Sequence, residues 1–341
     1  MNSPANTQLW RRFDSVRIAD AAERVRGVVV RTPLVPFDVG DPRIALRAKL
    51  ENRQVTGSFK ARGAWNQISQ LTADEKRRGV VCASSGNHGK AVAWAAQRAG
   101  VPATIVMPEN AYPNKIAACR EHGAEVVLAK TREIADEECA ARVAAGRVLV
   151  HPYDAERTLQ GAGTVGLEIA QDWPEVEVVV VCVGGGGLIS GSSLALRQTL
   201  GARVVILGAE PAGAPSLSRG VAQGSPVHLA QITSKVQGLT PTYSGQWNID
   251  VCRTTLDGIV LLEDETIFAG QERLVALGET VEPAGAAAFS VVWGRRLPDN
   301  LLAGRDARNP LRVAVVVSGG NPDPAQIEAV RARVGAGRPK S

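Results

Sequence analysis

Residues 176–191 read VEVVVVCVGGGGLISG, and they are the most informative stretch of the chain. Residues 176–183 are almost entirely apolar and rich in valine, which predicts a buried strand of a parallel sheet. Four glycines follow, and residues 188–200 then have the composition of a helix. Because glycine has no side chain, this loop leaves its backbone N–H groups open to an anion at the start of the helix. The stretch therefore predicts a strand, an anion site of phosphate size and a helix in succession.

Val- and Ile-rich segments alternate with Ala-rich segments from about residue 78 onward. The apolar runs predict strands and the Ala-rich runs predict helices, with short turns between them. This alternation is typical of an α/β fold with parallel sheets, in which ligands bind beyond the carboxyl ends of the strands. Residues 219–253 have little periodicity and are interpreted as a lid or an interface segment. Further strands are predicted at residues 80–82, 103–107, 125–129, 204–209 and 313–317, and further helices at residues 90–99 and 114–121.

The composition is that of an ordinary globular protein. The 341 residues are 45% hydrophobic and 21% charged, enough for one large domain or two smaller ones. The net charge is +5, but basic and acidic residues are interspersed and aromatic residues make up only 4%, which argues against a nucleic-acid partner. We also expect no membrane partner, because the sequence lacks an apolar stretch of the roughly 18 to 20 residues that span a bilayer.

The number and spacing of the cysteines indicate a reducing compartment. They are odd in number, widely spaced and without the spacing of a metal site. Most stand among apolar residues, which predicts buried thiols in a reducing compartment. The N-terminal region does not read as a secretory signal, so we expect a cytoplasmic protein. The five residues are Cys82, Cys119, Cys139, Cys182 and Cys252.

Lys60 follows a glycine turn in the segment TGSFKARGA, residues 56–64, and begins a predicted helix. The positive end of the helix dipole and desolvation both disfavour a charged lysine, so we expect a lowered pKa for Lys60. A neutral amine can form a Schiff base with an aldehyde. Taken alone, the segment favours a solvated surface lysine, and only the other segments described below reverse that preference.

A second polar turn, SSGNHG at residues 84–89, joins the predicted strand 80–82 to the next helix. Its backbone N–H groups would point at whatever lies above the turn, which favours a carboxylate ligand. A helix cap would explain one serine or asparagine, and His88 alone is more often structural. Two serines, an asparagine and a histidine in one turn exceed what a cap requires.

Two glycine turns have competing interpretations. Residues 184–187 also suit a dinucleotide, but that reading needs an acidic residue for the ribose, and only Glu210 is suitably placed. Ser318, in the SGGN turn at residues 318–321, could hydrogen-bond a pyridine nitrogen without protonating it. An ordinary turn between a strand and a helix is the alternative for that segment.

These segments together resemble the serine/threonine dehydratase and serine racemase family, which belongs to the tryptophan-synthase-β-like pyridoxal phosphate enzymes of fold type II. The similarity runs over about residues 18–320, and it also includes residues 151–154 and 161–164. It implies an α/β fold with two domains, each with a mostly parallel twisted sheet flanked by helices, and an active site in the cleft between them. The implied parts are a large cofactor-binding domain (residues 1–79 and 154–330), a small substrate-carboxylate-binding domain (residues 80–153) and a flexible basic tail (residues 331–341).

The resemblance also implies roles for individual residues. Lys60 would form the Schiff base with pyridoxal 5'-phosphate, Phe59 and Asn87 would flank the cofactor ring, and Ser318 would meet its pyridine nitrogen. Ser85 matches the position at which racemases place a second catalytic acid and base. The phosphate would be held by Gly184, Gly185, Gly186, Gly187 and Leu188, and the substrate carboxylate by Ser84, Ser85, Asn87 and His88.

Three positions depart from the family pattern. Metal-binding members have an acidic residue, a backbone carbonyl and a second acidic residue, which correspond here to Glu210, Ala214 and Ser216. Glu210 and Ala214 are the candidate ligands of a monovalent or divalent cation, and the serine disfavours such a cation, since an anionic oxygen ligand is lost. Lys90 stands where the family often has glutamine. Residues 234–239, SKVQGL, are more similar to the equivalent loop of cysteine synthases than to that of dehydratases.

The leading functional hypothesis is a lyase that eliminates water from a β-hydroxy amino acid of the threonine or serine type, giving a 2-oxo acid and ammonia. Ser85 favours a second hypothesis, racemisation of serine or aspartate, and a β-hydroxyaspartate dehydratase is a related possibility. Residues 234–239 favour a third, β-replacement as in cysteine synthases. A cofactor-free binding protein with a decayed site is disfavoured by the intact motifs. A homodimer that acts on a small amino acid is implied.

Overall fold

The computed structural model describes residues 9–336, and its larger sheet has six strands in the order β1-β2-β10-β7-β8-β9. All neighbouring strands are parallel except β1, which pairs antiparallel with β2. The predicted strands at residues 176–183, 204–209 and 313–317 are confirmed as β7, β8 and β10. The bounds are β1 (Leu34–Phe37), β2 (Ile44–Leu50), β7 (Val178–Cys182), β8 (Val205–Pro211), β9 (Gly258–Leu262) and β10 (Leu311–Val317).

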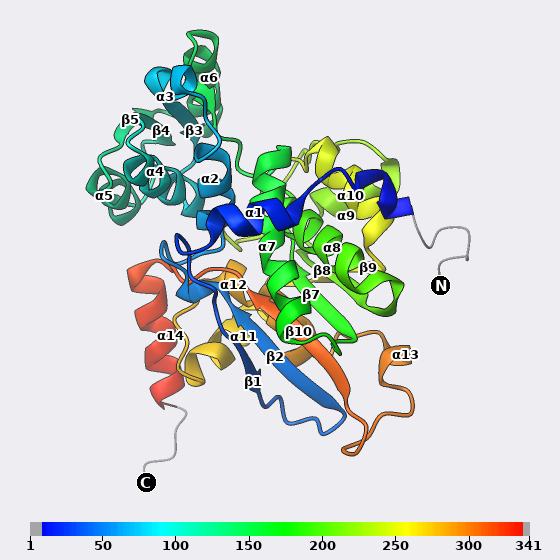
Figure 1. The fold of residues 1–341 in the computed structure, drawn as a ribbon. Helices are drawn as coiled ribbons and strands as arrows, with labels where there is room; N and C mark the ends of the chain where they lie inside the picture. The colour runs from blue at the N-terminus through cyan, green and yellow to red at the C-terminus, as the bar shows by residue number, and fades with distance from the viewer. Residues whose placement is uncertain (1–8, 337–341) are drawn as a thin grey trace.

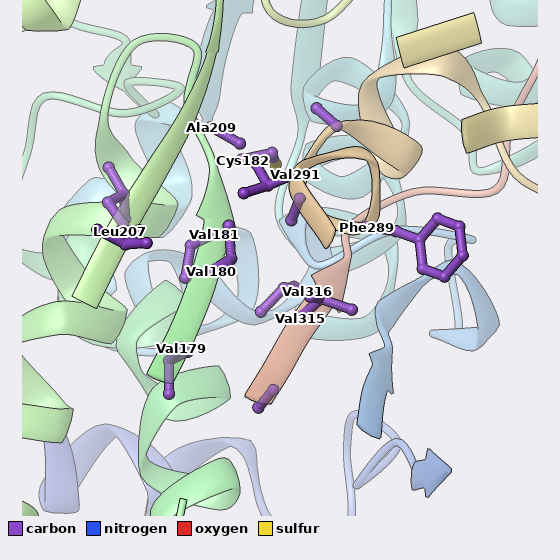
Figure 2. Packing of buried hydrophobic residues seen from close by; sticks show 14 of the residues in the cluster. Val179, Val180, Val181, Cys182, Leu207, Ala209, Phe289, Val291, Val315 and Val316 are labelled. Atoms are coloured by element: carbon purple, nitrogen blue, oxygen red, sulfur yellow. The ribbon is translucent and has the colours of Figure 1, made fainter. Parts of the chain in front are cut away.

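Helices cover both faces of this sheet (Figure 1). One face carries α1 (Ile18–Val25), α7 (Glu156–Asp172), α8 (Gly187–Leu200) and α10 (Gln246–Thr255), and the other carries α11 (Asp264–Ala276) and α12 (Pro283–Trp293). Because β7 is buried on both faces, its valines are enclosed by helices as well as by Val315 and Val316 of β10 (Figure 2). Glycines let α7 and α8 cross closely, since a Cβ on Gly166 would lie 2.3 Å from the Ser192 carbonyl oxygen.

The smaller sheet has four parallel strands in the order β5-β4-β3-β6. Helices α4 and α5 pack on one face and α6 on the other, and each face has its own apolar cluster. The predicted strands at residues 80–82, 103–107 and 125–129 and the helices at residues 90–99 and 114–121 are confirmed. The bounds are β3 (Val80–Ala83), β4 (Ala103–Pro108), β5 (Glu125–Ala129), β6 (Val148–Leu149), α3 (Ala73–Arg78), α4 (Asn87–Ala99), α5 (Pro113–Glu121) and α6 (Arg132–Ala144).

Helix α2 (Lys60–Ile68) lies between the two sheets (Figure 1). It packs against α4 on one side and α7 on the other. Ala64 and Ile68 belong to the apolar cluster of the smaller sheet, whereas Arg62 is buried against Glu168 of α7. The two sheets agree with a two-domain α/β fold, but α2 belongs to both packing regions. The boundaries at residues 79 and 153 stay a prediction.

The region of residues 219–253 is partly helical. Helix α9 (Ser216–Gln223) and α10 frame it, and residues 224–245 form a connection of turns that passes the glycine loop, where Gly238 lies against Gly184. The remaining elements are η2 (Leu9–Phe13), η3 (Glu51–Arg53), η4 (Gly201–Arg203), α13 (Asp299–Leu302) and α14 (Pro324–Ala336).

Part of the segment predicted as a flexible basic tail is helical. Residues 331–336 are the last part of α14 and are not a flexible tail, because Ile327 and Val330 of the same helix are buried and anchor it. Arg333 also pairs with Glu272 of α11. Residues 337–341 lie outside the described residues.

All five cysteines, each within the described residues, are buried free thiols, as the sequence predicts. None of the helices in residues 9–336 is both long and apolar enough to cross a bilayer.

Candidate active site

Three helices begin at the candidate site. Lys60, Asn87 and Gly187 are the first residues of α2, α4 and α8. The turns that precede α4 and α8 follow β3 and β7, so they lie at the carboxyl ends of parallel strands. The residues before these two helices are Gly86 and Gly186, which carry no side chain to cap the first N–H groups. Each of the two helix starts can therefore offer its N–H groups to an anion.

Lys60 is held at the centre of the site. Its side-chain nitrogen donates to the carbonyl oxygen of Pro152 at 2.6 Å and lies 5.0 Å from the centre of the Phe59 ring. Desolvation by burial lowers the pKa of Lys60 to about 8, as the sequence predicts. A substantial fraction of the amine is therefore neutral near physiological pH, which makes it a competent nucleophile and base.

The turn after β10 is tied to the Lys60 segment. The backbone N–H of Phe59 donates to the carbonyl oxygen of Ser318 at 3.1 Å, and Ser58 forms an isolated bridge with Gly319. These contacts bring Ser318 beside Lys60 although the two are far apart in sequence. The sequence-predicted Lys60, Phe59 and Ser318 thus share one site.

Cys182 is a neighbour of Ser318 that sequence reasoning did not place in the site. Its thiol donates to the Ser318 hydroxyl oxygen at 3.2 Å, since β7 and β10 are adjacent strands. Burial raises the pKa of Cys182 to about 11, so the thiol keeps its proton at neutral pH. A thiol that donates to the Ser318 oxygen leaves the hydroxyl proton of Ser318 free for another acceptor, such as a pyridine nitrogen.

Asn87 is fixed by two residues for which the sequence predicted no role. Its amide nitrogen donates to Glu282 Oε1 at 2.5 Å, and its amide oxygen accepts from Asn321 Nδ2 at 2.8 Å. Glu282 precedes Pro283 at the start of α12. The one signal in the sequence was a carboxylate at the beginning of an apolar, Ala-rich segment, and its partner is 195 positions away.

The glycine loop lies against Tyr153 and Asn248. A Cβ on Gly185 would lie 2.4 Å from the Tyr153 ring, and Gly186 has a φ of +97° that side-chain-bearing residues rarely adopt. The amide nitrogen of Asn248 donates to the carbonyl oxygen of Gly185 at 2.8 Å and holds the loop in place. The loop is therefore a backbone cradle whose shape requires glycine, and Leu188 behind it is buried.

The turn at residues 84–89 supplies the remaining predicted residues. Ser85 is exposed, and the Ser84 hydroxyl accepts from the backbone N–H of Gly86 at 3.3 Å. The ring of His88 is buried and bonds through Nε2 to the carbonyl oxygen of Val150 at 2.7 Å. Desolvation lowers the pKa of His88 to about 3, so the ring is neutral. The predicted contribution of His88 to a carboxylate site is thereby reduced to its backbone N–H.

The residues predicted for a cation make other polar contacts in the structure, and the cation itself stays a prediction. Both oxygens of Glu210 accept from the backbone N–H groups of Leu217 and Ser218, at 2.7 and 3.0 Å. The carbonyl oxygen of Ala214 accepts from the N–H of Ser216, whose hydroxyl bonds that of Ser244 at 2.9 Å. Within residues 9–336 no group of three or more His, Cys, Asp or Glu side chains could hold a metal ion. The carboxylate of Glu210 caps α9 instead.

The arrangement fits pyridoxal phosphate. A partly buried amine of lowered pKa begins α2, the backbone cradle at the start of α8 suits a phosphate, and Asn87 and Ser318 supply polar groups. The buried hydroxyls of Thr56 and Ser58, just before Lys60, have no hydrogen-bond partner among the described residues. They could therefore still form hydrogen bonds with a bound molecule.

Comparisons with known proteins agree with this geometry. The chain is 36% identical to phenylserine dehydratase of Ralstonia pickettii over 318 residues, which are 92% of this chain and 94% of that protein. It is 38% identical to L-threonine ammonia-lyase of Thermotoga maritima over 322 residues, 92% of this chain and 77% of that protein. The solved structure of maize serine racemase superposes with a TM-score of 0.83 at 32% identity, covering 94% of this chain and 97% of that one.

The match to a family model covers the whole candidate site. Residues 25–319 match the model described as pyridoxal-phosphate dependent enzyme, and this range includes Lys60, Asn87, the glycine loop and Ser318. Neighbours such as maize serine racemase have the fold that the resemblance implied, so the fold type II architecture is confirmed. From the fold, the site and these matches together, the chain belongs to the family of pyridoxal-phosphate dependent enzymes.

Proposed function

We propose that the chain is a pyridoxal phosphate-dependent ammonia lyase that eliminates water from a β-hydroxy amino acid and releases a 2-oxo acid and ammonia. The observation that carries the proposal is the amine of Lys60, which has a lowered pKa, donates to Pro152 and follows Phe59, whose backbone N–H donates to Ser318. Support for the reaction comes from relatives named phenylserine dehydratase and L-threonine ammonia-lyase. We propose threonine, serine or an aryl-substituted serine as the substrate.

Each part of the site would have one task. When bound, pyridoxal phosphate supplies a ring that stabilises negative charge at the substrate α-carbon. The glycine loop would bind its phosphate, and Ser318 and Asn87 would orient its ring. Lys60 would take the proton from the substrate α-carbon, because its lowered pKa keeps part of the amine neutral. Ser84 and the N–H groups at the start of α4 would hold the substrate carboxylate.

The test is product formation by the purified holoenzyme. We expect 2-oxo acid and ammonia from at least one of L-threonine, L-serine and L-phenylserine. Lys60→Ala is the control for the catalytic lysine and should lose the activity while the protein stays folded. If none of these substrates gives an oxo acid, the lyase proposal is rejected.

Racemisation is the second candidate function, and the observation that favours it is Ser85. This residue is exposed in the turn that leads into α4, next to the proposed carboxylate site, and a solved serine racemase is among the structural neighbours. Ser85→Ala should abolish racemisation of serine and leave elimination from L-serine intact. A racemisation rate that is unchanged in Ser85→Ala would remove Ser85 from this role.

We further propose a cytoplasmic homodimer. The free thiols support a reducing compartment, because five buried cysteines remain unpaired in the described part of the chain. Light scattering of the purified protein tests the assembly, and a mass near 72 kDa, twice the 35.9 kDa of one chain, is expected. A mass near 36 kDa at all concentrations would reject the dimer.

A further inference from the structure

Glu282 is placed against the site by the turn that follows β10. Its backbone N–H donates to the carbonyl oxygen of Gly319 at 3.1 Å. A Cβ on Gly319 would lie only 2.1 Å from Glu282 Oε1, so the absence of a side chain at position 319 is what makes room for the carboxylate. The carboxylate is thereby brought within hydrogen-bond distance of Asn87.

The contacts of Asn87 determine which way its amide faces. Glu282 Oε1 accepts from the amide nitrogen of Asn87, so the Asn87 NH₂ group, and not its oxygen, faces the carboxyl group. The Asn87 oxygen faces the NH₂ group of Asn321. With Glu282 removed, the Asn87 amide loses one of the two contacts that set its direction and keeps only the bond from Asn321.

Charged groups also fix the orientation of Asn321. Its amide nitrogen donates to the carbonyl oxygen of Thr56 at 2.9 Å, and its amide oxygen accepts from Lys90 Nζ at 3.3 Å. Its backbone carbonyl oxygen accepts from Lys115 Nζ at 2.6 Å. The hydrogen bonds therefore run in one direction, from Lys90 through Asn321 and Asn87 to the carboxyl group of Glu282.

This arrangement leaves Asn87 with a single free N–H. We propose that Glu282 is a positioning residue that orients the Asn87 amide, so that its second N–H donates to the oxygen substituent on the ring of bound pyridoxal phosphate. The inference rests on the proposed placement of the cofactor ring beside Asn87. It adds a task for a residue that neither touches Lys60 nor belongs to any of the sequence motifs.

Removing the Glu282 carboxyl group from water lowers the stability of the fold, so its position is best explained by a role in orienting Asn87. Desolvation raises the pKa of Glu282, while Lys115 and the bond from Asn87 act in the opposite direction. A carboxylate with a merely structural role would change the stability of the fold when it is removed. Removing such a carboxylate would not weaken the contact between Asn87 and the cofactor.

A double-mutant cycle on the full-length protein separates these possibilities. The variants are Glu282→Ala, Asn87→Ala and the double variant, and the measurement is the dissociation constant of pyridoxal phosphate, titrated by visible absorbance. We expect each single variant to weaken binding about tenfold or more, as for loss of a hydrogen bond to a charged group. The dissociation constant of the double variant should be no higher than that of the single variant that binds pyridoxal phosphate less tightly, because both substitutions remove the same contact.

Controls keep the result interpretable. Glu263→Ala is the matched control, since Glu263 precedes α11 as Glu282 precedes α12 but is exposed. Its dissociation constant should equal that of the unmodified protein. Glu282→Gln preserves side-chain volume in case Glu282→Ala does not fold, and it should also weaken binding, because glutamine can present either end of its amide to Asn87.

Three results would overturn the inference. One is a Glu282→Ala protein that is folded and binds within about twofold of the unmodified protein. Another is a double variant whose loss is the product of the single losses, which would mean that Glu282 acts independently of Asn87. If Asn87→Ala itself binds normally, the placement of the cofactor beside Asn87 fails, and the inference fails with it while the lyase proposal is tested by its own assay.

Discussion

The side-chain nitrogen of Lys60 donates to the carbonyl oxygen of Pro152 across 2.6 Å, and this contact joins the start of α2 to the connection that precedes α7. The amine is thus held inside the site by a neutral backbone group and not by a carboxylate. A carboxylate partner would favour the charged form and raise the pKa, whereas a carbonyl oxygen leaves desolvation dominant. The choice of partner is what keeps the lysine reactive.

The reactivity of Lys60 should follow its lowered pKa. The charged amine does not attack an aldehyde, so the rate at which the apoprotein incorporates pyridoxal phosphate should rise about tenfold per pH unit below pH 8 and level off above it. The measurement is the rise of visible absorbance after mixing. A small lysine analogue serves as the control for titration of the cofactor itself and should show no plateau near pH 8. A profile that keeps rising to pH 10 would contradict the lowered pKa.

The lowered pKa of Lys60 also makes the stability of the fold depend on pH. A lysine whose pKa is lower in the folded protein than in the unfolded chain binds fewer protons when folded. It therefore opposes folding below pH 8, and this opposition is relieved as the pH rises from about 8 toward 10.5, the pKa of an unperturbed lysine. The measurement is the unfolding free energy of the apoprotein between pH 8 and pH 10.5. Lys60→Met should lack the part of its rise with pH that comes from Lys60.

Arg62 should be essential for the fold. It is fully buried and donates to Glu51 and Glu168, and Lys49 donates to the same Glu168. Arg62→Ala leaves buried carboxylates without their partner, so we expect a loss of about 3–5 kcal/mol in the unfolding free energy, measured with urea. Arg77→Ala, which removes an exposed pair with Asp74, should cost less than about 1 kcal/mol. Equal effects of the two substitutions would contradict this account.

Acid should weaken the same network. Desolvation alone would raise the pKa of Glu51, but the Arg62 guanidinium and the Thr32 hydroxyl lower it below 4.5, the pKa of an unperturbed glutamate. A carboxyl group with a lowered pKa stabilises the fold above its unfolded pKa and loses this contribution as the pH falls through its folded pKa. Unfolding free energy should therefore decline below about pH 4.5, and Glu51→Gln should flatten that decline. An unchanged slope in the variant would remove Glu51 as the cause.

Gly186 should be required for cofactor binding, whereas Gly201 at the other end of α8 should not. An alanine Cβ at position 186 would lie 2.7 Å from the Asn248 Cβ, and the φ of +97° is unfavourable for alanine. We expect Gly186→Ala to weaken pyridoxal phosphate binding by at least about tenfold, because the loop must move. Gly201 has a φ of +68° and no neighbour within 4 Å. Gly201→Ala should lower stability by about 1–2 kcal/mol without changing cofactor affinity, and normal binding by Gly186→Ala would contradict the cradle.

Divalent cations should have no effect on the protein as it stands. The candidate ligands Glu210 and Ala214 are satisfied by backbone N–H groups, and Ser216 supplies no charge. The midpoint of thermal unfolding should be the same in chelator as with added Ca²⁺ or Mg²⁺. Ser216→Asp should become sensitive to Ca²⁺, because it adds an anionic oxygen ligand beside Glu210. A chelator that lowers the unfolding midpoint of the unmodified protein would contradict this prediction.

Local patterns in the sequence predicted most of the secondary structure. The valines of β7 and the alanines of α4 follow the periodicities of a strand and a helix, and the glycines at positions 184–187 mark the loop between β7 and α8. The prediction of a flexible tail was wrong for residues 331–336, because the buried Ile327 and Val330 hold α14 against the protein. The irregular region before α10 also contained a helix, α9, that its composition obscured.

The amino-acid sequence by itself determined the order of strands and helices, the family, and the residues that stand at the carboxyl ends of the strands. Backbone periodicity and glycine turns are local properties, so they can be read along the chain. Only the tertiary structure decided that Glu282 faces Asn87, that Cys182 donates to Ser318, and that Glu210 caps a helix. These contacts join residues on separate elements, and their partners are set by how the two sheets and α2 pack, which a one-dimensional pattern does not record.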